Sequence, residues 1–120
     1  MSKVLNAKCA CGAVKAKASG PFRDATACHC ESCRRQSGHY IAATRVDASS
    51  LKFENKTHLK WWYATDEAKR GFCSECGSLM FWQADGSDQI SIFMGCLDAP
   101  TGIQLTKHIY LEEKGDYYEV

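Results

Sequence analysis

The chain has 120 residues, 45% of them hydrophobic, and a net charge of +1. This length suits a single domain, residues 1–120, and excludes two ordinary hydrophobic cores. The near-neutral charge gives no bulk attraction to nucleic acid or to anionic membranes, so we expect neither as a partner.

Short strand-like segments follow one another along the chain and are separated by turn residues. Val14, Ala16 and Ala18 alternate with lysines, which predicts a half-exposed strand ending at Gly20 and Pro21. Aromatic, β-branched or alternating apolar residues predict five further strands. These lie at residues 39–46, 58–65, 78–85, 89–97 and 107–113.

Helical periodicity is weak, with two exceptions. One helical turn is expected near residues 31–36 and another near residues 47–53, where Asp47 is the candidate cap. The pattern therefore predicts a mainly β fold with one or two short helical turns.

Some side chains have an expected environment. Ile90, Ile92 and Met94 share a strand face with Cys96, so we expect Cys96 to be buried. Trp61 and Trp62 are adjacent in a strand and cannot both point inward, and one of them could line a cleft. Cations scattered between residues 52 and 70 are expected on the solvated surface. These are Lys52, Lys56, Lys60, Lys69 and Arg70.

Eight cysteines are the unusual feature of the composition. The N-terminal sequence lacks the apolar segment of a signal peptide, and no apolar run approaches the roughly 20 residues of a membrane helix. We therefore expect a cytoplasmic protein with reduced thiols. Clustered thiols in that compartment favour metal binding over disulfides.

Two of the cysteine motifs predict one closed metal site. In CSECG, Cys73 and Cys76 form a C-x-x-C turn, which supplies two ligands of a tetrahedral zinc site. In CACG, Cys9 and Cys11 are two positions apart, so they face the same way in an extended chain. We expect these four cysteines to hold a structural zinc that ties together distant parts of a small domain.

The motif CHCESC contains Cys28, Cys30 and Cys33 in one short loop. Three protein ligands with an open fourth position are the pattern of catalytic zinc. Two alternatives stay open on spacing alone. Cys96 or His29 could fill the fourth position, or the three thiols could be reduced and empty.

His29, Arg34 and Arg35 are candidates for roles beside this loop. His29 could move protons near neutral pH, but in an extended segment it faces away from its neighbours, which favours a structural role. Arg34 and Arg35 could bind the carboxylates of a substrate, or form a solvated basic pair.

The order of these motifs resembles the family of glutathione-dependent formaldehyde-activating enzymes, which is grouped with centromere protein V. The resemblance rests on CACGAV, CHCESCRRQSG, GFCSECGS, GCLDAP and KHIYLEEKGDYYEV, and it spans Cys9 to Val120. It implies a β-tent-like, zinc-stabilised fold of several small antiparallel sheets.

The resemblance also implies two zinc ions per chain. The structural zinc would use Cys9, Cys11, Cys73 and Cys76. The second would use Cys28, Cys30 and Cys33, with partial occupancy because glutathione is thought to displace it.

The implied activity is that of a zinc-dependent carbon–sulfur lyase, in which glutathione and formaldehyde give S-hydroxymethylglutathione. The expected partners are thus a small thiol and a small aldehyde, and we lean towards an enzyme. The alternatives are a non-catalytic zinc-stabilised binding module and a thiol redox sensor. The oligomeric state does not follow from the sequence.

The division into structural and functional cysteines is testable by thermal unfolding with zinc analysis. We expect Cys76→Ser to prevent stable folding, because metal binding to the four-ligand site is largely folding free energy. The matched variant Cys30→Ser should stay folded and carry less zinc. Equal thermal stability of the two variants would contradict the division.

Overall fold

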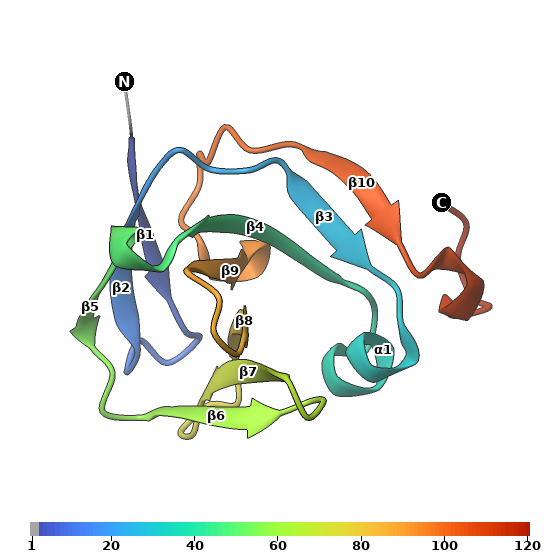
Figure 1. Ribbon diagram of the computed structural model, residues 1–120, viewed down its shortest axis with the longest axis horizontal. Coiled ribbons are helices and arrows are strands. Elements are labelled where there is room, and N and C mark those ends of the chain that lie inside the picture. The colour runs from blue at the N-terminus through green and yellow to red at the C-terminus, as the bar shows by residue number, and fades with distance from the viewer. Residues whose placement is uncertain (1–2) are drawn as a thin grey trace.

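A computed structural model describes residues 3–120, which form two β-sheets and one short α-helix (Figure 1). The mainly β prediction is confirmed. The first five strands are β1 (Val4–Lys8), β2 (Lys15–Ser19), β3 (Ala25–Cys28), β4 (Ile41–Asp47) and β5 (Leu51–Asn55). The other five are β6 (Leu59–Tyr63), β7 (Ala68–Cys73), β8 (Leu79–Ala84), β9 (Gln89–Phe93) and β10 (Leu105–Ile109). The helix α1 spans Glu31–Ser37, and 3-10 turns cover Ala48–Ser50, Met94–Cys96 and Leu111–Glu113.

The smaller sheet has the order β1-β2-β5 and is antiparallel throughout. Its strands bury every second side chain, including Leu5 on β1 and Ala16 and Ala18 on β2. The lysines between them are exposed, as the alternation predicted.

The larger sheet has the order β10-β3-β4-β9-β8-β7-β6 and curves across the rest of the molecule (Figure 1). Its strands are antiparallel except for the edge pair β10 and β3, which run parallel. The family resemblance implied several small antiparallel sheets. The structure agrees with this in having mostly antiparallel pairing, and the larger of its two sheets is mixed because β10 runs parallel to β3.

The core lies between the two sheets. Phe81 and Met80 of β8 and Ile92 of β9 are fully buried there, and Phe53 of β5 meets Phe81 edge-on at 5.5 Å between ring centroids. Trp61 packs partly against this core. Trp62, the next residue in the chain, points to solvent, as strand alternation requires.

Several boundaries differ from the expectations. Residues 47–53 were expected to be one helical turn, but only Ala48–Ser50 is helical and β5 begins at Leu51. Asp47 makes no side-chain cap; its carboxylate accepts a hydrogen bond from Gln89 instead. The strand expected over residues 89–97 ends at Phe93, so Cys96 is buried in a 3-10 turn rather than on a strand face. Strands β1, β3, β5 and β7 were not expected, because each carries at most one β-branched residue.

Within residues 3–120 no helix is long and apolar enough to cross a membrane.

Candidate metal centres and central cavity

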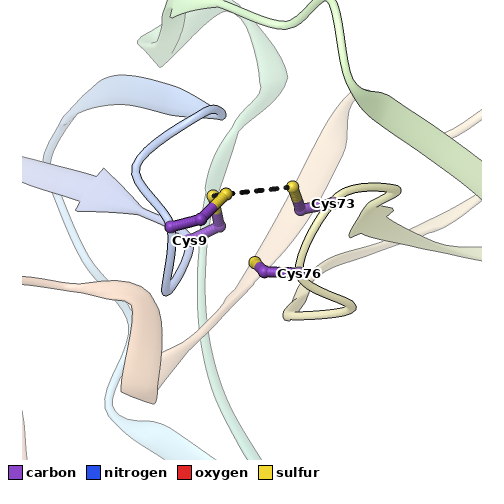
Figure 2. Close-up of side chains that lie close together, drawn as sticks. Cys9, Cys73 and Cys76 are labelled. Carbon is purple, nitrogen blue, oxygen red and sulfur yellow. Dashed lines mark hydrogen bonds between the residues drawn. The ribbon is translucent and has the colours of Figure 1, made fainter.

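The four-cysteine cluster consists of Cys9, Cys11, Cys73 and Cys76, whose sulfurs all lie within 4.8 Å of one another. Cys9 and Cys11 come from the turn after β1. Cys73 ends β7, and Cys76 lies in the turn that leads to β8. Figure 2 shows the labelled sulfurs of Cys9, Cys73 and Cys76 directed towards one point from these two turns.

The sulfur geometry of this cluster fits a tetrahedral metal ion. Four sulfurs about 2.3 Å from zinc are about 3.8 Å apart along each tetrahedral edge. The Sγ atoms of Cys9 and Cys11 are 3.7 Å apart, and those of Cys11 and Cys73 are 3.8 Å apart. The donor set and its spacing are therefore compatible with a closed four-sulfur site for a metal such as zinc.

Hydrogen bonds stabilise the thiolate form of these ligands. The backbone N–H of Val14 donates to Cys9 Sγ at 3.2 Å. The hydroxyl of Ser78, followed by its backbone N–H, lowers the pKa of Cys76 to about 5. Ser78 also accepts from the backbone N–H of Ala10 at 2.9 Å, so this one side chain joins the two turns.

The three-cysteine cluster consists of Cys28, Cys30 and Cys33, whose sulfurs also lie within 4.8 Å of one another. Cys28 is the last residue of β3, Cys30 caps α1, and Cys33 is buried in the first turn of that helix. The backbone N–H of Cys33 donates to Cys30 Sγ at 3.3 Å. The hydrogen bond from the Cys33 thiol is the largest of the effects that lower the pKa of Cys28 to about 6.

Neither candidate for a fourth protein ligand reaches this cluster. The sulfur of Cys96 contacts the backbone oxygen of Leu79 at 3.2 Å, and the charges that act on it come from Cys9 and Cys76. Cys96 therefore lies beside the four-cysteine cluster. It is buried, as expected, and this burial raises the pKa of its thiol to about 12.

His29 points away from the sulfurs on either side of it. Its ring is 1% exposed and packs with Tyr40, and its Nε2 lies 2.9 Å from His108 Nδ1. Its Nδ1 lies 2.5 Å from the Tyr118 hydroxyl. Both ring nitrogens of His29 therefore make hydrogen bonds, and this buried network connects the cysteine loop to the C-terminal segment.

Arg70 of β7 is 4% exposed and lies beside the three-cysteine cluster. Its guanidinium donates to Cys33 Sγ at 3.4 Å, to Ser32 Oγ at 2.9 Å and to Gln36 Oε1 at 2.6 Å. It makes no ion pair with a carboxylate within residues 3–120. A buried cation needs a compensating negative charge, and a thiolate at Cys28, whose pKa the charge of Arg70 helps to lower, would supply one. The expectation that Arg70 lies on the solvated surface is wrong.

A cavity of about 540 Å³, the central cavity, opens beside the three-cysteine cluster. Ile41, Ala43 and Arg45 lie at alternate positions of β4 and all line it, so one face of the large sheet forms its wall. Trp82 of β8 and Arg70 of β7 line the wall further along the same sheet. The tryptophan at the cavity is therefore Trp82 and neither member of the Trp61–Trp62 pair.

The two arginines that follow the cysteine loop do not line the central cavity. Arg35 is exposed and pairs with Glu31 at 2.8 Å, one helical turn away. Three other arginines line it: Arg23, Arg45 and Arg70. Sequence reasoning missed them because each comes from a different segment. Strand alternation from Ile41 to Arg45 was the one local signal available.

Comparisons with known proteins agree with this architecture. The family model described as glutathione-dependent formaldehyde-activating enzyme matches residues 4–113. The fold is similar to the crystal structure of a Rhodobacter sphaeroides protein that was a structural genomics target. The TM-score is 0.66 and the identity 26%, over 84% of this chain and 99% of that chain. None of the curated proteins searched matches the chain.

The fold and the two sulfur clusters define a cysteine-rich, mainly β protein with two candidate metal centres, one of which adjoins a cavity. The family model matches nearly the whole chain, and a match of this extent establishes family membership. The chain belongs to the family of glutathione-dependent formaldehyde-activating enzymes.

The role of Arg70 is testable by zinc competition with a chromophoric chelator. In Arg70→Met the loss of positive charge raises the pKa of the Cys28 thiol, so protons compete better with zinc. We expect zinc affinity at the three-cysteine cluster to fall about 10- to 100-fold, as is typical when a group that supports a metal ligand is removed.

The matched control is Lys69→Met, since the Lys69 ammonium lies over the Trp61 ring, 4.7 Å from its centroid, and away from the cysteines. This variant should retain both zinc affinities of the wild type. An unchanged affinity in Arg70→Met would show that the arginine does not support the cluster.

Proposed function

We propose that the chain is a carbon–sulfur lyase that acts on the adduct of a small thiol and a small aldehyde, with glutathione and formaldehyde as the candidate pair. The observation that carries the proposal is the three-cysteine cluster. It lies beside a buried arginine and adjoins a cavity of about 540 Å³ in a chain of this family. A volume of this size accommodates a small-molecule ligand.

The reaction forms one bond and moves one proton. The thiol sulfur attacks the aldehyde carbon to form the carbon–sulfur bond, and the carbonyl electron pair moves onto oxygen. The thiol proton ends on that oxygen, which gives a hydroxymethyl thioether. In the lyase direction the hydroxyl loses its proton, the carbon–sulfur bond breaks and the thiolate leaves. Neither direction needs an oxidant or a reductant.

Cys28, Cys30 and Cys33 would hold a zinc ion in this account. When bound, zinc supplies Lewis acidity that favours a thiolate or polarises a carbonyl at neutral pH. Arg70 balances the charge of the thiolate ligands from its contact with Cys33. The apolar wall around Ile41 and Phe93 reduces access of bulk water to the reacting groups.

His29 has a positioning role in this proposal. Its ring nitrogens face His108 and Tyr118 and not the central cavity, so it holds the loop between two ligands in place. Water in the open part of the cavity would then carry the proton between sulfur and oxygen.

The cysteines also suit the compartment that we propose. All eight are free thiols in the structure, and a reducing environment such as the cytoplasm keeps clustered thiols available for metal.

Exchange NMR with glutathione and formaldehyde tests the activity directly, because the adduct and its precursors interconvert without other reagents. The zinc-loaded protein should accelerate adduct formation and breakdown, and Cys33→Ser should lose most of this acceleration while its four-cysteine cluster keeps zinc. Exchange no faster than in buffer with free zinc would overturn the proposal. A folded protein that carries one tight zinc and shows no acceleration would favour the binding module.

A further inference from the structure

Arg23 and Arg45 lie side by side in the central cavity, at a distance from the cysteines. Cys28 pairs with Ile41 in the ladder between β3 and β4. Arg45 lies four residues further along β4, or about 13 Å between the Cα atoms of Ile41 and Arg45. The backbone N–H of Arg23 donates to the Arg45 carbonyl at 3.2 Å, which places the two residues together.

Each of these side chains is held in place but keeps unused donors. Arg23 Nη2 donates to the Ala43 carbonyl at 3.1 Å. Arg45 Nε donates to Ser91 Oγ at 3.4 Å, and its guanidinium carbon lies 5.8 Å from the centroid of the Trp82 ring. Within residues 3–120, neither Nη group of Arg45 makes a hydrogen bond. An arginine ordered in this way loses little entropy when it binds a ligand.

The pair also has no acidic partner. The ion pairs among residues 3–120 do not include Arg23 or Arg45. Among residues 3–120, Glu67 is the one carboxylate that lines the central cavity. Asp47 lines a second hollow together with both arginines, but it accepts from Gln89 and forms no ion pair with either of them. Partial burial, followed by the charge of Arg45, lowers the pKa of Arg23. Two adjacent cations without a counterion attract an anion.

We propose that Arg23 and Arg45 form a carboxylate-binding site that selects acidic thiols as substrates. The inference rests on the proposed function for the thiol end of the ligand, whose sulfur would lie at the three-cysteine cluster. A carboxylate accepts two parallel hydrogen bonds from a guanidinium fork, so the free Nη groups of Arg45 match it in geometry and charge. Because Arg45 lies well along β4 from the cysteines, the carboxylate of the ligand must lie several bonds from the ligand's own sulfur.

The probe for this site is S-methylglutathione, which keeps both carboxylates of glutathione but cannot supply a thiolate. Titration calorimetry of the zinc-loaded full chain gives its dissociation constant. Arg45→Met and Arg23→Met should each weaken binding about tenfold or more, because each loses a charge-assisted hydrogen bond. Arg45→Lys keeps the charge but not the fork, so its affinity should fall between wild type and Arg45→Met.

Arg35→Met is the matched control, since it removes the same charge from an exposed residue of α1 outside the central cavity. It should bind the probe as the wild type does. Circular dichroism and thermal unfolding establish that each variant is folded. The diethyl ester of S-methylglutathione provides a test on the wild-type protein alone, and it should bind at least tenfold more weakly than the acid.

Equal affinity of the wild type for the acid and its diethyl ester would overturn the carboxylate site, as would wild-type affinity in both arginine variants. No binding of the probe to the wild type would overturn it too. Exchange NMR measures the proposed lyase activity independently of binding of the probe. Arginine-dependent binding without acceleration would refute the lyase and keep the site. Acceleration with arginine-independent binding would refute the site and keep the lyase.

Discussion

The convergence of four sulfurs from two separate turns is the constraint on which the rest of the structure depends. Cys9 and Cys11 lie in the turn that follows β1 of the small sheet, and Cys73 and Cys76 lie at the end of β7 and in the turn that follows it in the large sheet. Besides core packing, the backbone of β1 contacts the segment after β9 through the bridge between Ala7 and Leu97. A 120-residue chain has a modest core, so a metal bound here would supply folding free energy that packing alone does not.

The two cysteine clusters are connected through β7. Cys73 and Arg70 lie three residues apart on β7, and strict alternation would place them on opposite faces. The register of β7 with β6 is regular, so the two side chains do lie on opposite faces, and both are buried because both faces of β7 are covered here. A metal ion bound by the four-cysteine cluster would therefore hold β7 in the position from which Arg70 reaches Cys33. A structural site and a candidate catalytic site share one strand.

Features that depend only on local backbone geometry could be predicted from the sequence. The grouping of Cys9, Cys11, Cys73 and Cys76 follows from the spacing within each turn, and alternation predicts that His29 faces away from its neighbours. The environment of Arg70 did not follow, because the packing of α1 against it is a tertiary feature. The contribution of Arg45 to the central cavity likewise depends on which strands lie beside β4. The parallel pairing of β10 with β3 depends on the path of the whole chain.

The claim that matters most is that one sulfur cluster is closed and the other is open. Diffraction from zinc-loaded crystals at the zinc absorption edge, with X-ray absorption spectroscopy of the same protein, tests it directly. The account predicts two metal ions. One has four sulfurs at about 2.3 Å, and the other has Cys28, Cys30, Cys33 and a fourth position that no protein atom occupies. A fourth protein ligand at the second ion, or no metal at that cluster in the zinc-loaded protein, would contradict the account.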